Sequence, residues 1–286
     1  MSIVVTGATG PFGRSVVQSL LARGVPAADI TATGRSVERI ADLAALGVRV
    51  VASDYDEPAS LAGVLAGADV VVLVSGSEIG RRVPQHRNVI DAAVAAGVGR
   101  IVYTSIPRAS ETPMVLAQEH RATEDAIRES GLPSTMLRNA WYVENYLSQI
   151  PTYLEHGVVG AAGDGRVSVA ARADYAEAAA VVASTDGHVG AVYELGGDSP
   201  TLAELAALVS EAAGQDVAYT DVDEDTLRGI LVDAAGLPEP VAAVYADVDS
   251  RIRAGDLHVT SGDLERLIGR APTSVAEAVK AAVAAL

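Results

Sequence analysis

Short apolar runs alternate with amphipathic stretches through the first half of the chain. The runs are rich in β-branched residues, as expected of buried strands, and they span 2–6, 30–33, 48–52, 70–74, 100–104 and 134–138. The stretches between them space their apolar residues as a helix does, over 15–24, 36–47, 56–67, 83–97 and 115–131. Strand–helix alternation of this kind predicts an α/β fold with a parallel sheet covered by helices on both faces.

The pattern changes after about residue 141. A strand, a loop and a helix are predicted over 192–214, with the capping box Thr201–Glu204 at the start of the helix, and a second box, Ser274–Glu277, opens the last helix. No linker rich in Gly, Ser or Pro separates the halves. We therefore expect a nucleotide-binding domain over 1–145, which also receives the strand–helix–strand segment 167–197. The rest of 146–286 is expected to form a smaller α+β region that binds the substrate.

A glycine-rich turn joins the first predicted strand to the first helix. Its sequence, VVTGATGPFGRS, contains Gly7, Gly10 and Gly13. In a βαβ unit, the first glycine permits a tight turn, the second lets a pyrophosphate approach the backbone, and the third lets the helix pack closely on the strand. The helix N-terminus then presents free N–H groups to the phosphates. The alternative is a turn that is merely rich in glycine, but the strand–turn–helix context favours a dinucleotide site.

The end of the second strand bears on which dinucleotide binds. Sites that prefer NAD usually place Asp or Glu there for the ribose 2′-hydroxyl, whereas this strand is followed by Arg35. A guanidinium suits a 2′-phosphate, so we expect NADPH, with NADH as a weaker cofactor. The alternative is that Arg35 is a solvated residue before the next helix. The following two loops add candidates near the adenine and the middle of the cofactor: Asp54, Tyr55, Ser75, Gly76 and Ser77.

Composition excludes several classes of function. Lys and Arg number 21 against 37 Asp and Glu, a net charge of −16, and no basic cluster is present to bind nucleic acid. The chain has no cysteine, which excludes thiolate chemistry, and its five histidines lack the spacing of metal ligands. No signal peptide or membrane-spanning stretch is recognisable, so a cytoplasmic protein is expected. The sequence does not predict an oligomeric state.

The proton-transfer pair of the short-chain dehydrogenases is missing. In those enzymes a Lys four residues after a Tyr lowers the pKa of the phenol, but the only lysine here is Lys280. In the helix where the pair belongs, the sequence has His120 and Glu124, on one helix face. We expect Glu124 to lie on the helix surface, paired with Arg128, as Arg121 would pair with Asp125. Two roles stay open for His120: a residue of the helix surface, or a neutral group that assists at the nicotinamide.

Six segments carry a family resemblance: GATGPFG, PQHRNVIDAA, EHRATE, LRNAWYVENY, ARADYAEAAA and VYELGGDSPTLAELA. Together they resemble the NmrA-like atypical short-chain dehydrogenases, and within them the bacterial type 2 NAD(P)H:quinone oxidoreductases, over essentially the whole chain. The resemblance implies a Rossmann-type, doubly wound sheet and a smaller C-terminal domain, with NADPH in the cleft between them. It also implies two-electron reduction of a quinone without flavin or metal.

The same resemblance implies a set of cofactor contacts. They fall on Gly7, Ala8, Thr9, Gly10, Pro11, Phe12, Arg35, Asn139, Trp141, Tyr142, Glu144 and Arg172. The chain departs from the family at Pro11, where Gln is common. Because proline has no backbone N–H, one contact to the pyrophosphate is in doubt.

The aromatic stretch NAWYVENY fits a flat acceptor. A quinone accepts hydride readily, so the enzyme has chiefly to hold the ring at about 3–3.5 Å from the nicotinamide. We interpret Asn139 as a hydrogen-bonding amide and the aromatic residues as walls of the slot. The predicted acceptor-side and nicotinamide-side residues are Asn139, Tyr142, Tyr146, His120, Trp141, Thr104 and Ser105. The alternative is that these aromatic side chains only pack between the two halves.

Two other functions stay open. The triarylmethane dye reductases share the fold and the missing Tyr–Lys pair, but they act on bulky cations, so a larger and more acidic cleft would favour them. NmrA-like proteins also include redox sensors that bind NADP(H) without turnover and signal to a partner protein. No feature of the sequence marks such a partner surface.

Overall fold

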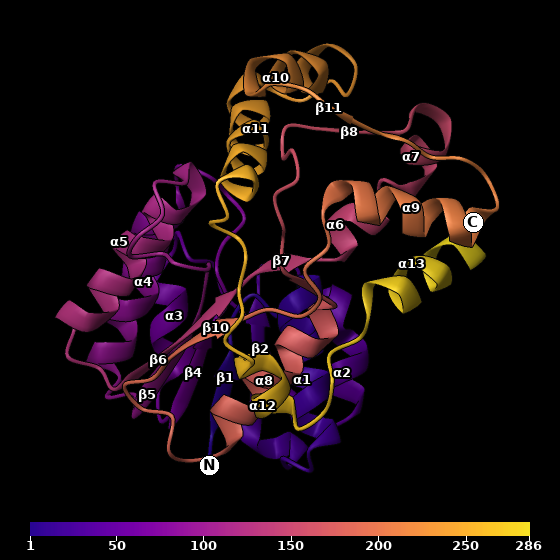
Figure 1. Ribbon diagram of the computed structural model, residues 1–286. Helices are drawn as coiled ribbons and strands as arrows, with labels where there is room; N and C mark the ends of the chain where they lie inside the picture. The colour runs from indigo at the N-terminus through magenta and orange to yellow at the C-terminus, as the bar shows by residue number, and fades with distance from the viewer.

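The computed structural model describes residues 1–286, whose central element is a seven-stranded parallel sheet (Figure 1). The strand order is β10-β6-β5-β4-β1-β2-β3. The strands are β1 (Ile3–Val5), β2 (Ile30–Gly34), β3 (Arg49–Ala52), β4 (Val70–Leu73), β5 (Arg100–Ser105), β6 (Ser134–Asn139) and β10 (Val192–Leu195). The first six coincide with the six apolar runs. The predicted α/β fold with a Rossmann-type, doubly wound sheet is confirmed.

Helices cover both faces of the sheet. On one face α1 (Pro11–Ala22) packs against α8 (Arg172–Ser184), and α12 (Asp263–Ile268) packs against α8. The short element η1 (Ala27–Asp29) precedes β2, and η2 (Val37–Ile40) and α2 (Ala41–Ala45) connect β2 to β3. On the other face α3 (Pro58–Leu65), α4 (Arg82–Ala95) and α5 (Val115–Glu129) pack in sequence order. Each face has its own apolar core.

Helix α8 is buried on nearly all sides because it lies between α1, α12 and the sheet. Its run of alanines lets these elements approach closely, since a methyl group takes little space at a helix–helix contact. Strand β10 then adds to the sheet beside β6. The segments 172–184 and 192–195 therefore lie with the sheet, although 143–166 lies elsewhere. The exact division of the chain into two domains stays a prediction.

The remaining elements form a smaller region beyond the end of the sheet that is opposite the N-terminus (Figure 1). Two parallel strand pairs occur there, β7 (Trp141–Tyr142) with β9 (Val169–Ala170) and β8 (Val158–Gly160) with β11 (Tyr219–Asp221). The helices are α6 (Glu144–Leu147), α7 (Ile150–His156), α9 (Leu202–Ala213), α10 (Glu224–Asp233), α11 (Glu239–Arg253) and α13 (Val275–Ala284). Both predicted capping boxes are present, at the starts of α9 and α13. None of the helices combines the length and the apolar character needed to cross a membrane.

The sheet topology determines where the functional loops meet. Because all seven strands are parallel, the loops that follow them gather at one edge of the sheet. The glycine turn follows β1, Arg35 follows β2, Asp54 follows β3 and Ser75 follows β4. Side chains from four separate parts of the sequence therefore lie around one crevice.

Candidate functional site

A cavity of about 420 Å³ lies at the carboxyl edge of the sheet. Its wall is formed by the loops after β1, β2, β3 and β4, with contributions from β7 and the start of α8. The predicted cofactor-binding residues on this wall are Gly7, Thr9, Gly10, Pro11, Phe12, Arg35, Asp54, Tyr55, Ser75, Gly76, Ser77, Tyr142 and Arg172. The structure thus brings together most of the residues expected to contact a dinucleotide.

The glycine turn has the backbone geometry that its sequence predicts. Gly7 has φ +61°, in the left-handed region that favours glycine. A Cβ on Gly13 would lie 2.5 Å from the carbonyl oxygen of Gly7, so only glycine lets α1 start this close to β1. The backbone N–H groups of Phe12 and Gly13 have no acceptor within the protein. With the positive end of the helix dipole, they form an anion site that opens into the cavity.

Pro11 is the first residue of α1, where its ring fits without strain. Because proline has no backbone N–H, this helix N-terminus has one hydrogen-bond donor fewer. The N–H groups of Phe12 and Gly13 stay available. The geometry of the turn is thus intact, and the loss of one contact to a bound pyrophosphate stays a prediction.

Two arginines also belong to the cavity wall. Arg35 and Arg39 both line it, and the Nη1 atom of Arg35 lies 2.8 Å from Oε1 of Glu78, in the loop after β4. Sequence reasoning missed Arg39 and Glu78. Arg39 lies in η2, four residues after Arg35, which precedes that helix, so no sequence spacing rule would have paired them. The other lining residues that were not predicted are Gly34, Ser53, Val74 and Gln85.

The loop after β4 is held from behind by buried side chains. The N–H of Ser75 donates to the hydroxyl of Thr104 at 2.8 Å, and the N–H of Gly76 donates to Nε2 of His86 at 2.9 Å. Nε of Arg82 donates to the carbonyl of Gly76 at 2.9 Å. Burial and the Arg82 cation lower the pKa of His86 to about 3, so its ring stays neutral and can accept this bond. Thr104 thus supports the cavity wall from the protein interior and does not line it.

An aromatic and cationic stack forms another part of the cavity wall. The rings of Phe12 and Tyr142 stack with centroids 5.9 Å apart, and the Arg172 guanidinium lies 5.5 Å from the centroid of the Tyr142 ring. Glu144 accepts hydrogen bonds from the N–H of Arg172 at 2.9 and 3.1 Å, so it positions the start of α8 from outside the cavity. Burial raises the pKa of the Tyr142 phenol to about 12. The phenol is therefore protonated at neutral pH.

Asn139 ends strand β6 and is buried, and neither Nδ2 nor Oδ1 of its amide has a hydrogen-bond partner of good geometry, although the amide is close enough to the Tyr142 phenol to offset part of the rise that burial causes in the pKa of that group. An unsatisfied buried amide costs about 1–3 kcal/mol for each group, which marks a place where a ligand is expected. Side chains alternate along a strand, and Arg138 faces α5, so Asn139 faces the α1–α8 side, where Tyr142 also lies. Asn139 is not part of the cavity wall itself.

Three further predicted residues do not reach the cavity. Trp141 and Tyr146 are half-buried and pack against the apolar core of the smaller region. Ala8 is fully buried, and its N–H donates to the carbonyl of Thr33 at 2.8 Å. The structure therefore assigns these three side chains to packing or to the shape of the turn.

His120 is buried on the opposite face of the sheet from the aromatic stack. Its Nδ1 atom lies 2.7 Å from the hydroxyl of Tyr103, whose ring is fully buried in the core beneath α4 and α5. Burial lowers the pKa of His120 well below its usual range, and the Arg82 cation lowers it further. The imidazole is thus neutral, as the alternative of an assisting group requires, but it is not on the cavity wall. No group of three or more His, Asp or Glu side chains is arranged to hold a metal ion.

Glu124 corrects a prediction, because it is fully buried and does not lie on the helix surface. It accepts hydrogen bonds from Nε and Nη2 of Arg138 at 2.9 and 2.7 Å and from the hydroxyl of Ser105 at 2.6 Å. The predicted pair with Arg128 is also present, at 2.7 Å. Burial raises the pKa of Glu124, but these bonds lower it by more, so the net pKa is below the usual range. The Ser105 hydroxyl therefore donates to the carboxylate of this ion pair, and Ser105 does not line the cavity.

The predicted ion pair between Arg121 and Asp125 does not form. Arg121 donates to the carbonyl oxygens of Ala109 and Thr112, both at 2.7 Å, and Asp125 pairs with Arg128 at 2.8 Å. The reason is that the loop before α5 folds back over the helix and presents unpaired carbonyl groups. A guanidinium satisfies these better than one exposed carboxylate would.

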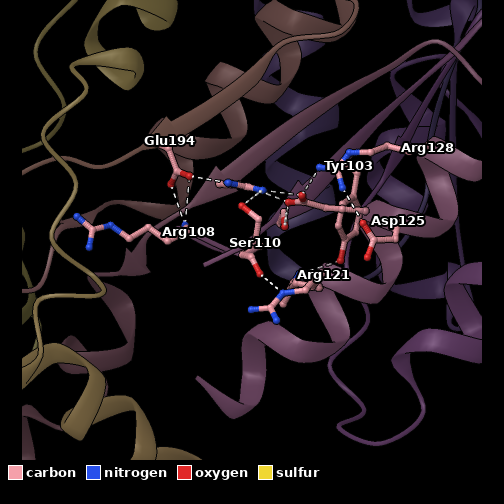
Figure 2. A network of polar contacts seen from close by, with 12 residues as sticks. Tyr103, Arg108, Ser110, Arg121, Asp125, Arg128 and Glu194 are labelled. Carbon is pink, nitrogen blue, oxygen red and sulfur yellow. Dashed lines mark hydrogen bonds and ion pairs between the residues drawn. The ribbon is translucent and has the colours of Figure 1, made fainter. Parts of the chain in front are cut away.

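The ion network continues to the edge of the sheet, where Figure 2 shows Glu194 and Arg108 at the end opposite to Arg128 and Asp125. Nη1 of Arg138 lies 3.0 Å from Oε1 of Glu194, whose carboxylate accepts the backbone N–H of Arg108 at 3.1 and 3.2 Å. Arg108 has φ +49° and is the one non-glycine residue with positive φ. The buried pair thus also holds the strained loop that follows β5.

Comparisons with known proteins agree with this geometry. The model of the NmrA-like family matches residues 1–251. The chain is 47% identical to quinone oxidoreductase 2 of Escherichia coli K12, over 97% of each chain. It is similar to the crystal structure of an E. coli NADPH-dependent quinone oxidoreductase complexed with NADPH, with a TM-score of 0.94, 46% identity, and 98% and 99% of the two chains covered. A Citrobacter sp. triphenylmethane reductase complexed with NADP(H) gives a TM-score of 0.92 and 40% identity, over 98% of this chain and 100% of the other.

Proposed function

Because the chain belongs to the NmrA-like family, we propose that it is an NADPH-dependent reductase of quinones or similar small aromatic acceptors. One observation carries the proposal: a single cavity is lined by the glycine turn at the start of α1, by two arginines and by an aromatic stack. The names of the E. coli relatives support quinone reduction and NADPH as the cofactor.

The residues on the wall fit the parts of NADPH. We propose that Arg35 and Arg39 bind the 2′-phosphate and that the N–H groups of Phe12 and Gly13 bind the pyrophosphate. The unsatisfied amide of Asn139 matches the donor and acceptor of a carboxamide. Bound NADPH would supply the hydride for the reduction. The protein itself would bind and orient the cofactor and the acceptor, through the arginines and the stacked ring on the cavity wall.

On the acceptor side we propose Tyr142, which lines the cavity, as the residue that contacts the ring or its oxygens. Asn139 is the second predicted residue, but its amide lies behind the wall and would reach a ligand only if the wall moves. The phenol of Tyr142 is protonated at neutral pH and can donate a hydrogen bond to a quinone oxygen. Tyr146 and His120 would act only through packing, since both lie behind the wall. A product phenolate can take its proton from water, so no Tyr–Lys pair is required.

The first test is NADPH oxidation by the purified protein, followed by absorbance. We expect oxidation that depends on both the protein and an added quinone such as menadione or a benzoquinone. A cationic triarylmethane dye, compared at equal concentration, tests the second candidate function, which the similarity to the Citrobacter reductase favours. Tight NADP(H) binding without turnover of either acceptor would contradict both and favour a redox sensor.

A second test concerns the 2′-phosphate. Arg35→Asp is expected to weaken NADPH binding about 30-fold, because a charge-assisted hydrogen bond contributes about 1.5–3 kcal/mol, while NADH binding changes only slightly. The control is Arg87→Asp, the same charge change at an exposed position on α4 away from the cavity. Titration calorimetry with each cofactor measures both affinities. Equal losses for NADPH and NADH would mean that the 2′-phosphate does not bind at Arg35.

A further inference from the structure

The ion pair between Arg35 and Glu78 joins two loops of the cavity wall. Arg35 follows β2 and Glu78 belongs to the loop after β4, and β1 lies between these two strands in the sheet. The pair therefore bridges the glycine turn that follows β1, and Thr9 and Gly10 line the cavity with it. With 2.8 Å between Nη1 and Oε1, the contact is direct. The Glu78 carboxylate is thus already paired with the guanidinium that, under the proposed function, binds the 2′-phosphate.

Glu78 is held in this position by its loop. The buried bonds to the backbone of Ser75 and Gly76 fix the loop at one end, and the N–H of Gly80 donates to Oε1 of Glu119 at 3.0 Å at the other. Nε2 of Gln85 donates to Oε2 of Glu78 at 3.4 Å and to Oδ2 of Asp56 at 3.0 Å. The carboxylate is therefore supported from the protein side and is not a freely moving surface group.

Arg35 is less constrained. Its side chain is 60% exposed, and Glu78 is its only hydrogen-bond or ion-pair partner. An exposed pair of this kind is weak, worth roughly 0–1 kcal/mol. A phosphate carries more charge than a carboxylate and binds a guanidinium with two parallel hydrogen bonds. A 2′-phosphate can consequently displace Glu78, but it must break this pair and then lie near the displaced carboxylate.

We propose that Glu78 is a specificity-determining residue that competes with the 2′-phosphate for Arg35 and so reduces the preference for NADPH over NADH. The proposal rests on the proposed function, which puts the 2′-phosphate at Arg35. NADH has a hydroxyl group in place of the phosphate, and this leaves the Arg35–Glu78 pair intact. The hydroxyl can also donate to Glu78, as it does to the carboxylate that follows the second strand in NAD sites.

The test is the affinity of the protein for NADPH and NADH, measured by titration calorimetry on the wild type and Glu78→Gln. The amide keeps the shape of the side chain and removes its charge. We expect Glu78→Gln to bind NADPH about fivefold more tightly, which corresponds to about 1 kcal/mol, and to change NADH binding less than about twofold. The matched control is Glu57→Gln, which removes one charge at an exposed side chain with no partner and no contact with the cavity.

A second comparison separates competition for Arg35 from general repulsion. In an Arg35→Gln background, Glu78→Gln should tighten NADPH binding less than about twofold, because there is no guanidinium to compete for and only repulsion between two exposed charges remains. Equal tightening in both backgrounds would overturn the proposal. Unchanged or weaker NADPH binding by Glu78→Gln, or equal tightening by Glu57→Gln, would overturn the proposal. A wild-type protein that binds neither cofactor would instead overturn the proposed function itself, and this inference with it.

Discussion

Replacing Glu124 by glutamine is expected to lower the free energy of unfolding by about 3–5 kcal/mol, the usual result of removing one partner from a buried ion pair. Arg138 is almost as buried as Glu124, with 7% of its side chain exposed. In the variant its guanidinium would keep only the contact to Glu194 as an ionic partner. Denaturant unfolding of the two proteins measures the difference.

The control is on the same helix. Asp125→Asn also removes a carboxylate that contacts Arg128, but this side chain is 53% exposed, so the expected loss is below about 1 kcal/mol. Equal losses in the two variants would show that burial of Glu124 does not determine its contribution. In a double-mutant cycle with Arg138→Met, the coupling energy isolates the pair from the rest of the network.

The Glu124 contribution also has a defined pH dependence. Its pKa is lowered in the folded protein, so its stabilising effect is complete above the pKa of an unfolded glutamate and is lost as the pH falls through the lowered folded value. The difference between the wild type and Glu124→Gln should therefore shrink in acid. A difference that stays constant down to the acid transition would contradict this account.

The second large effect is expected for Gly13→Ala. The added Cβ would lie 2.5 Å from the oxygen and 2.8 Å from the carbon of the Gly7 carbonyl, and 2.9 Å from Cα of Ala8. These are backbone atoms of the turn, so α1 must move away from β1, and the N–H groups of the anion site move with it. We expect NADPH binding to weaken at least about 100-fold and stability to fall by about 1–3 kcal/mol.

Gly63→Ala is the matched control for this change. Gly63 lies within α3 with open space around the added Cβ, so the substitution should stabilise the helix by about 0.5–1 kcal/mol and leave cofactor binding unchanged. Calorimetric titration and thermal unfolding distinguish the two variants. Normal NADPH affinity in Gly13→Ala would show that the pyrophosphate does not depend on the close packing of α1.

Much of the cavity could be predicted from the sequence because its parts depend on local signals and on topology. Apolar runs determine the strands, and a parallel sheet gathers the loops after its strands at one edge. Gly7, Arg35, Tyr55 and Ser75 each lie in the loop that follows a strand, so knowing the strands was enough to expect them together. The roles of these residues toward a cofactor stay predictions.

The contacts that the sequence did not predict are formed between distant elements. Glu124 looked like a surface residue because the i,i+4 rule considers only partners on its own helix, whereas Arg138 comes from the neighbouring strand β6. Trp141 and Tyr146 face the core of the smaller region, which no local pattern defined in advance. Glu78 was adjacent to a predicted residue, but its partner lies beyond β1 in the sheet.

The position of helix α8 has a consequence for how the protein folds. One face of the sheet is covered only when residues 172–184 pack against α1 and β10 joins β6. A chain that ended near residue 145 would contain the whole glycine turn and six strands, yet the apolar side chains beneath α8 would be left in water. The cofactor-binding half is therefore not expected to fold as an independent fragment. During synthesis, this half can complete its folding only after α8 has been made, and α8 follows the first elements of the smaller region in the sequence.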